Sequence, residues 1–224
     1  MTATFPDISI STERLVLRPY EEADIPALVE MMNDELMTAW TSAPQPYTAE
    51  DARDFVTRAA PAEREQGRGI VLAVTEFLTQ RLVGTVSLGH TDWRIRGTEA
   101  GYLTASWARG EGYACESVLA VCRWLFREQG FERVELRTAA DNTASQQVAQ
   151  KIGCVSEGVL RGAGLVRTRP DGDPAEAWTE TRTDLLVWSL LPEDLEDLGL
   201  PGGPGSGAGE DDYDPAYPSY ADWR

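Results

Sequence analysis

The chain has 224 residues, enough for one large domain, and 42% of them are hydrophobic, which suits a globular core. The net charge of −17 argues against nucleic acid as a partner, and no apolar run approaches the ~18 residues of a membrane-spanning helix. One histidine and three cysteines without ligand spacing predict no metal site. The N-terminus lacks the pattern of a secretory signal, so we expect a cytoplasmic protein with reduced thiols.

The first half of the chain mixes predicted strands and helices. Residues 14–18 form a short alternating run that a proline ends, which predicts a strand. Asp24 is placed to cap a first helix, and Thr48 opens a capping-box pattern that predicts a second helix. Two alternating runs around a turn near residue 80 then predict a hairpin of residues 70–74 and 82–88.

The second half predicts a strand at residues 99–104 and then the best-defined helix of the chain. That helix follows Gly112 and ends near Gly130, where a C-terminal cap belongs. Its apolar residues recur at three- and four-residue steps, at Ala114, Val118, Val121, Cys122, Leu125 and Phe126.

The remaining elements complete an α/β pattern. Residues 134–138 alternate as a strand, and a helix follows Asn142 and ends at Gly153. Two further strands, at residues 155–166 and 183–191, are expected to close the domain as a hairpin.

The junction between the strand at residues 99–104 and the long helix contains two glycines. Backbone N–H groups at a helix start have no intrahelical partner, and the helix dipole makes that end positive. Glycines let a phosphate approach such groups, so a candidate anion cradle consists of Arg109 and the amides of Gly110, Gly112, Tyr113 and Ala114. The alternative is that the glycines only make a tight turn.

Nucleotides fit this junction poorly. A Walker A loop needs a Gly-Lys-Ser/Thr ending, which is absent, and Cys115 stands where the dinucleotide fingerprint needs a third glycine. The pyrophosphate of coenzyme A, which needs a similar cradle, is the third option.

The stretch resembles the acyl-CoA binding motif of the GNAT N-acetyltransferases, Arg/Gln-x-x-Gly-x-Gly/Ala, with Arg109, Gly112 and Ala114 at the motif positions. More narrowly, Gly101-Tyr102 followed by ARGEGYACE is similar to the ribosomal-protein alanine acetyltransferase (RimJ/RimL-like) branch. The resemblance covers about residues 11–195, because other pieces agree with the branch in order: TERLVLRPY, VGTVSL, DNTAS, QKIGCVSEGVLR and DLLVWSLLPED.

The resemblance implies a GNAT fold, with a mixed, mostly antiparallel sheet of about seven strands flanked by helices, in a domain of residues 1–198. Residues 199–224 fall outside it and have the composition of a flexible acidic tail rich in Gly, Pro and Tyr. The resemblance to the GNAT family also implies acetyl-CoA or another acyl-CoA as co-substrate, no metal, and a monomer or homodimer. The acceptor is an amine, either a protein N-terminus or a small molecule, and a cationic one would suit the net charge.

Acyl transfer needs a neutral amine, a hydrogen-bond donor for the oxyanion, and stabilisation of the leaving thiolate. The resemblance implies that Glu99 is the base, directly or through water, unless it is only a surface carboxylate. It implies the backbone N–H of Leu103 as the oxyanion donor. Asn142 would contact the cofactor arm and Ser145 would protonate the thiolate, although Asn142 also suits a helix cap.

The acceptor side is less defined. Asp184 matches a family aspartate that could hold a cationic amine, or it is an edge charge. Tyr102 and Trp93 are further candidates, and Trp93, like Trp178 and Trp188, could equally fill the core or its rim. Departures from the branch on this side, such as Leu103 in place of an aromatic residue, leave the acceptor open.

We therefore expect an N-acyltransferase in which a primary amine attacks the thioester directly. The alternative is a non-catalytic CoA-binding sensor or scaffold whose tail docks a partner. Both predict CoA binding, but only the enzyme predicts turnover.

Overall fold

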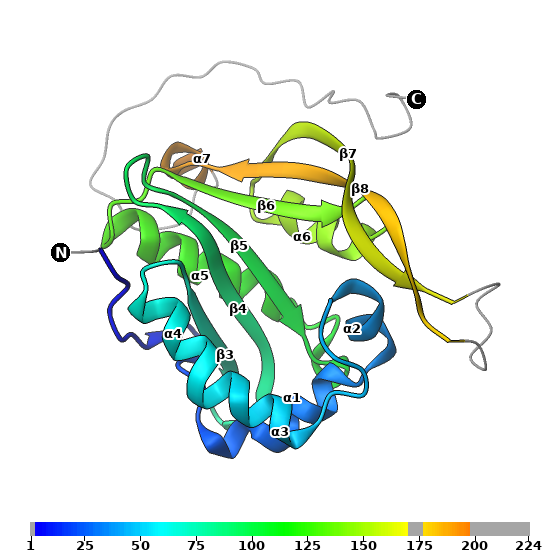
Figure 1. Ribbon diagram of the computed structural model, residues 1–224. Coiled ribbons are helices and arrows are strands. Elements are labelled where there is room, and N and C mark those ends of the chain that lie inside the picture. Colours follow the sequence, from blue (N-terminus) through cyan, green and yellow to red (C-terminus); the bar gives the residue numbers. More distant parts are fainter. Residues whose placement is uncertain (1–2, 170–176, 198–224) are drawn as a thin grey trace.

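A computed structural model describes residues 3–169 and 177–197 and arranges eight strands in one open sheet (Figure 1). The spatial order is β1-β2-β3-β4-β5-β6-β8-β7, and the pairing is antiparallel except between β5 and β6, which are parallel. The strands are β1 (Ile10–Ser11), β2 (Leu15–Arg18), β3 (Ile70–Glu76), β4 (Leu82–Asp92), β5 (Gly97–Thr104), β6 (Arg133–Ala139), β7 (Val155–Thr168) and β8 (Thr179–Leu190). The predicted mixed, mostly antiparallel sheet is confirmed.

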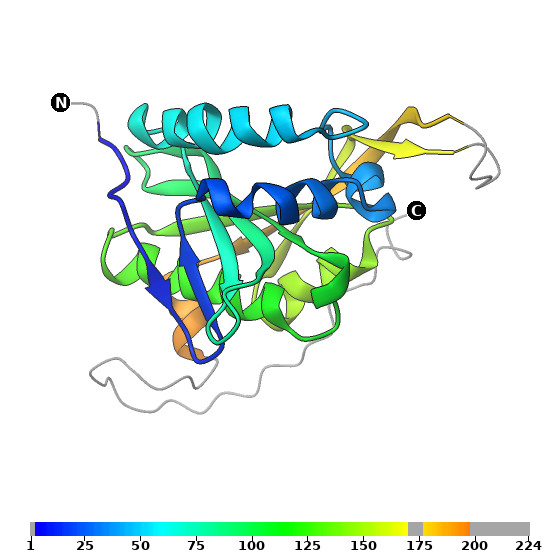
Figure 2. The same ribbon diagram turned by 90° about the horizontal axis from the view of Figure 1, so that it is seen from below.

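Helices cover both faces of the sheet (Figure 2). One face carries α1 (Ile25–Met32), α3 (Ala49–Asp54) and α4 (Ala60–Glu65), with a π-helical turn at Phe55–Ala59 joining the last two. The opposite face carries α5 (Tyr113–Arg127) and α6 (Thr143–Lys151). The short α2 (Glu35–Trp40) contacts β7, and α7 (Pro192–Asp197) follows β8.

The core lies between the sheet and these helix layers. The apolar stripe predicted for α5 faces inward, and Val118, Val121, Cys122 and Leu125 are buried. Burying a Val or Leu side chain stabilises the fold by ~1.5–3 kcal/mol relative to leaving it in water. Burial also raises the pKa of the Cys122 thiol, so this cysteine stays neutral and packs as a small apolar residue.

The parallel pairing of β5 with β6 covers only the start of each strand. Residues 97–99 pair with residues 133–135, and after Glu99 the two strands part. β5 continues to Thr104 against β4, while β6 continues to Ala139 against β8. The sheet is therefore open between β5 and β6 at the end where the predicted glycine junction follows β5.

Some local expectations differ from the structure. The sheet has eight strands rather than about seven, because β1 has two residues and is too short for a visible alternation. The short α2 was not predicted either. Thr48 opens α3 with the predicted capping box. Asp24 does not cap α1, because its carboxylate accepts hydrogen bonds from the Arg18 guanidinium and from the backbone N–H of Glu21. The predicted tail, from residue 199, lies outside the described residues.

A buried hydrogen bond between β6 and β8 provides a test of the packing beside the opening. The indole N–H of Trp188 donates to the hydroxyl of Thr138 at 3.0 Å, and both side chains are buried. Thr138→Val should lower the free energy of unfolding by ~1–3 kcal/mol, measured by urea denaturation, because the buried N–H loses its acceptor. The double variant with Trp188→Phe should lose less than the sum of the two single variants, and strict additivity would contradict a role for this bond.

Candidate active site

A cleft of about 500 Å³ lies where β5 and β6 part. Its walls come from the separated strand ends, the N-terminal turns of α5 and α6, α2, and the β7–β8 hairpin. The glycine junction and two helix starts thus open into one space. The predicted residues that line it are Tyr102, Leu103, Arg109, Gly110, Gly112, Tyr113, Ala114, Asn142 and Ser145.

The two glycines of the junction adopt left-handed backbone conformations, with φ of 84° at Gly110 and 80° at Gly112. A Cβ atom on Gly110 would meet nothing within 4 Å, so backbone conformation rather than crowding requires glycine there. Within the part of the chain that the structure describes, no hydrogen bond joins the backbone N–H of Gly112, Tyr113 or Ala114 to a protein atom. The junction therefore presents donors at the start of α5 that a ligand can use.

The side chain of Arg109 is directed toward α2. Its guanidinium binds the carboxylate of Asp34, which also accepts the Leu36 backbone N–H at 3.1 Å. Burial would raise the pKa of Asp34, but the hydrogen bond and charge of Arg109 outweigh it and hold the pKa below its ordinary value. Arg109 thus joins the junction to α2, and no pattern in the sequence indicates Asp34 as its partner.

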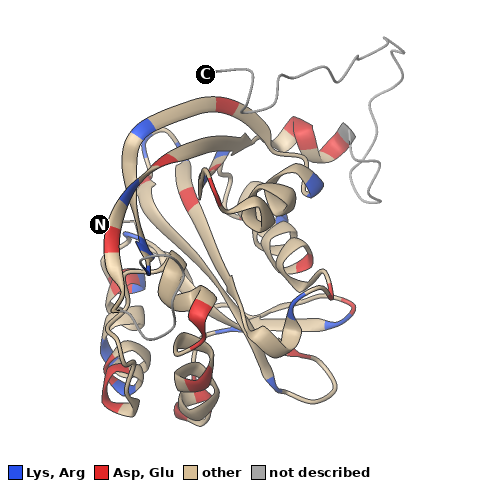
Figure 3. Ribbon diagram, turned by 90° about the vertical axis from the view of Figure 1, so that its right-hand side faces the viewer, with Lys and Arg blue, Asp and Glu red and all other residues tan. Residues whose placement is uncertain are grey.

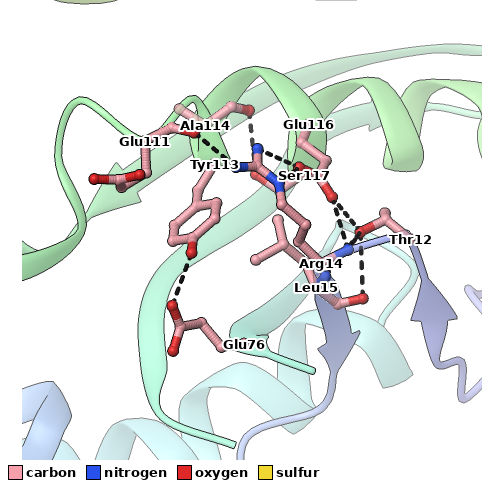
Figure 4. A network of polar contacts seen from close by, with 9 residues as sticks. All are labelled: Thr12, Arg14, Leu15, Glu76, Glu111, Tyr113, Ala114, Glu116 and Ser117. Carbon is pink, nitrogen blue, oxygen red and sulfur yellow. Dashed lines mark hydrogen bonds and ion pairs between the residues drawn. The ribbon is translucent and has the colours of Figure 1, made fainter. Parts of the chain in front are cut away.

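Arg14, just before β2, contacts the same junction from another side (Figure 4). Its guanidinium donates to the carbonyl of Glu111 at 3.0 Å and to the carboxylate of Glu116 at 2.7 Å. It also lies 4.8 Å from the ring centre of Tyr113. Burial would raise the pKa of Glu116, but hydrogen bonds from Thr12 and Arg14 hold it below the ordinary value. No pattern in the sequence pairs Glu116 with Arg14.

Asn142 and Ser145 lie together at the start of α6. The side-chain oxygen of Asn142 accepts the Ser145 backbone N–H at 3.1 Å, so Asn142 caps this helix. The carbonyl of Ser145 accepts the Tyr102 hydroxyl at 3.1 Å. Burial raises the pKa of Tyr102 to about 12, so this phenol stays protonated at neutral pH. The cap leaves both Asn142 and Ser145 on the cleft wall.

The ladder between β4 and β5 decides which N–H groups face the opening. The Ala105 N–H donates to the carbonyl of Val83 at 2.9 Å, so this residue faces β4. Backbone groups alternate in direction along an antiparallel strand, so Leu103 also faces β4, and Tyr102 and Thr104 face the side from which β6 has parted. The structure therefore does not direct the Leu103 N–H into the cleft, contrary to what the resemblance implies.

Glu99 is the last residue of β5 that pairs with β6, and it is not among the described residues that line the cleft. Its carboxylate lies 3.1 Å from Nδ1 of the exposed His90 and 3.5 Å from Nε of Arg137. Arg137 does line the cleft and also binds Glu135 at 2.8 Å. Arg137 therefore contacts the Glu99 carboxylate and also lines the cleft.

Two predicted acceptor-side residues lie elsewhere. Trp93 packs against Phe5 and Phe131, with ring centres 4.8 and 5.3 Å apart, and its indole N–H donates to the Gly67 carbonyl. The carboxylate of Asp184 accepts the Gly162 N–H at 2.7 Å, where the β7–β8 register shifts. The structure thus does not bring either residue to the cleft wall.

The charge of the cleft differs from that of the whole chain. Among the described residues that line it there is no Asp or Glu, and the charged ones are Arg109, Arg137 and Lys151. One wall is apolar and includes Leu36 and Leu165, which are 47% and 64% exposed. Elsewhere along the described ribbon, acidic and basic residues are interspersed (Figure 3). Sequence reasoning had no pattern for this wall, which α2 and β7 form together.

The described residues contain neither a metal-binding group nor a membrane-spanning helix. In residues 3–169 and 177–197, His, Cys, Asp and Glu form no group that could hold a metal ion. Within the same residues no helix has the length and apolar character that crossing a bilayer requires.

The glycine conformations give a direct test. Gly110→Ala and Gly112→Ala should each lower the free energy of unfolding by ~1–2 kcal/mol, measured by urea denaturation, because a Cβ is unfavourable in the left-handed region. Gly89→Ala is a matched control, since a Cβ there, like one on Gly110, meets nothing within 4 Å, but the φ of Gly89 is not left-handed. Equal losses in all three variants would contradict the conformational explanation.

Comparisons with known proteins agree with this architecture. The profile of the Acetyltransferase (GNAT) domain matches residues 14–155. The uncharacterized N-acetyltransferase YoaA of Bacillus subtilis is 27% identical over 152 residues, which span 68% of this chain and 85% of YoaA. Mycobacterium smegmatis RimJ in complex with CoA-disulfide has a TM-score of 0.69 at 20% identity, over 84% of this chain and 90% of RimJ. For the ribosomal-protein-S5-alanine acetyltransferase from Vibrio fischeri the TM-score is 0.67 at 19% identity, over 84% and 99% of the chains. The profile match spans more than half of the sequence, and the chain therefore belongs to the GNAT acetyltransferase family.

Proposed function

We propose that this protein transfers an acetyl group from acetyl-CoA to a primary amine. The observation that carries the proposal is the junction of β5 and α5, where unpaired N–H groups open into a cleft between two separated strands. A diphosphate bound at this helix start would leave the pantetheine arm free to enter the cleft. The complex of RimJ, a protein of similar fold, with a CoA compound supports this choice of ligand.

In the proposed reaction, the amine nitrogen attacks the thioester carbonyl carbon, a C–N bond forms, and the C–S bond breaks. The oxyanion needs a donor, and we assign that role to the backbone N–H of Tyr102 or Thr104, because these groups face the opening and that of Leu103 does not. The thiolate leaves near the start of α6. There the helix dipole stabilises negative charge, and we assign the return of a proton to the hydroxyl of Ser145, which lines the cleft.

Glu99 remains our candidate for the base, acting through water. Its carboxylate does not line the cleft, and it contacts Arg137, which does, so a water is needed to connect it to the acceptor. The attacking amine must therefore give up its proton easily. The positive charge of Lys151 assists, because it disfavours an ammonium in the cleft, whereas the carboxylates of Glu99 and Glu135 balance the charge of Arg137.

These charges change the expectation about the acceptor. A cationic acceptor would find no carboxylate among the described lining residues. A weakly basic amine fits better: an α-amine has a pKa of about 7.7–8.0, whereas that of a lysine side chain is about 10.4. We therefore propose an uncharged, weakly basic amine next to an apolar group, which the wall around Leu36 and Leu165 would contact.

Two variants test the catalytic roles. Glu99→Gln and Ser145→Ala should each lower kcat by about 10²-fold in a thiol-release assay, because each removes one proton-transfer group. CoA affinity, measured by calorimetry, should change less than about twofold, since neither side chain is in the diphosphate cradle. Glu157→Gln is a control on the neighbouring surface, where Glu157 binds Arg133.

Equal losses of CoA affinity and turnover in the two variants would show that the assigned roles are wrong. CoA binding without turnover across a panel of peptides and small amines would instead favour the non-catalytic CoA-binding alternative.

The acceptor proposal has its own test. At pH 7.5 a short apolar peptide with a free α-amine should give at least about tenfold higher kcat/KM than the same peptide with its α-amine blocked and a lysine added, because more of the α-amine is neutral. The rate with the α-amine should rise with pH until about 8 and then level off. A preference for the lysine peptide or for polyamines would contradict this proposal.

A further inference from the structure

One side chain holds the cradle from outside the cleft. Arg14 does not line the cleft, yet it contacts three consecutive parts of the junction (Figure 4). Its Nη1 donates to the carbonyl oxygen of Glu111, its Nε donates to the carboxylate of Glu116, and its guanidinium lies over the ring of Tyr113. These three contacts span the last loop residues and the first turn of α5.

The contact with the Glu111 carbonyl has a geometric consequence. That carbonyl and the N–H of Gly112 belong to the same peptide group, which is planar and trans, so they point in opposite directions. Arg14 holds the carbonyl on the side away from the cleft, and the Gly112 N–H is thereby directed to the cleft side, where Gly112 is a wall residue. Gly112 itself, with φ of 80°, has more than one accessible backbone conformation and needs such a restraint.

Arg14 is itself held in place. The Glu116 carboxylate accepts the Thr12 hydroxyl at 2.6 Å and the Arg14 backbone N–H at 3.2 Å, in addition to the guanidinium. The Tyr113 hydroxyl donates to Glu76 on β3 at 2.7 Å, which fixes the ring that the guanidinium covers. The β1–β2 turn and β3 thus restrain the start of α5.

We propose that Arg14 is a positioning residue for the diphosphate of acetyl-CoA, acting by orienting the Gly112 N–H through the Glu111 carbonyl. This inference rests on the proposed function. It predicts an effect specific to the diphosphate and not to the thioester, because Arg14 contacts the cradle and not the strands that surround the reacting atoms.

A simpler explanation would be long-range attraction between the Arg14 charge and the phosphates. The two explanations differ in sign for Glu116→Gln. Removing this carboxylate takes away a negative charge near the phosphates and would tighten CoA binding if attraction alone mattered. If positioning matters, the guanidinium loses its anchor and CoA binding weakens.

The experiment compares two donors, acetyl-CoA and S-acetylpantetheine, which lacks the diphosphate. Arg14→Met should raise KM for acetyl-CoA by about tenfold or more, the size expected from losing a hydrogen bond to a charged group, while kcat/KM for S-acetylpantetheine changes less than about twofold. Glu116→Gln should weaken CoA binding in calorimetry. Arg68→Met is the matched control, because Arg68 is an exposed arginine paired with Glu63 and away from the cradle.

If Arg14→Met lowered kcat/KM equally with both donors, Arg14 would have only a general structural role. If Glu116→Gln bound CoA more tightly than the wild type, simple attraction and not positioning would explain the effect of Arg14. Either result overturns the inference while leaving the proposed function intact. If the wild-type chain released no thiol with any amine, the proposed function would fail separately. CoA affinity of Arg14→Met against wild type would then still decide the role of Arg14, and unchanged affinity would overturn it.

Discussion

The site depends on an interruption of backbone hydrogen bonding within the sheet. Residues 97–99 of β5 pair with β6, and the pairing then stops while both strands continue against other partners. If it continued, the N–H groups of Tyr102 and Thr104 would be used inside the sheet. Because it stops, one strand edge carries free donors beside the start of α5, which has unpaired donors of its own. One missing stretch of ladder thus gathers the polar backbone groups that can bind an anionic, carbonyl-containing ligand.

Local features of the fold could be predicted from the sequence, and most features of the cleft wall could not. The glycine junction, the apolar stripe of α5 and the Thr48 capping box each involve residues within a few positions of one another, so their patterns are visible in the chain. The pairing of Arg14 with Glu116 and of Arg109 with Asp34 joins distant segments, and a charged residue in a sequence does not identify its partner. The direction of the Leu103 N–H depends on strand register, where one residue reverses the outcome.

The distribution of charge separates the whole chain from its cleft. A net charge of −17 suggests an environment for cations, yet the described lining residues include arginine and lysine and no carboxylate. Net charge is a sum over the whole surface and relates to solubility, so it does not determine the charge of one cleft. The candidate base Glu99 is not among the described lining residues and contacts Arg137, which is.

The short parallel pairing of β5 with β6, here called the seam, also has a consequence for how the chain folds. Strands β3, β4 and β5 follow one another as antiparallel neighbours, as do β7 and β8, so each group can assemble from nearby segments at a small loop-closure cost. Joining β5 to β6 instead requires the whole of α5 to pack first as a crossover. During refolding the two groups are therefore expected to form early and the seam late. The protein would acquire its compact halves before it acquires a place to bind its ligand.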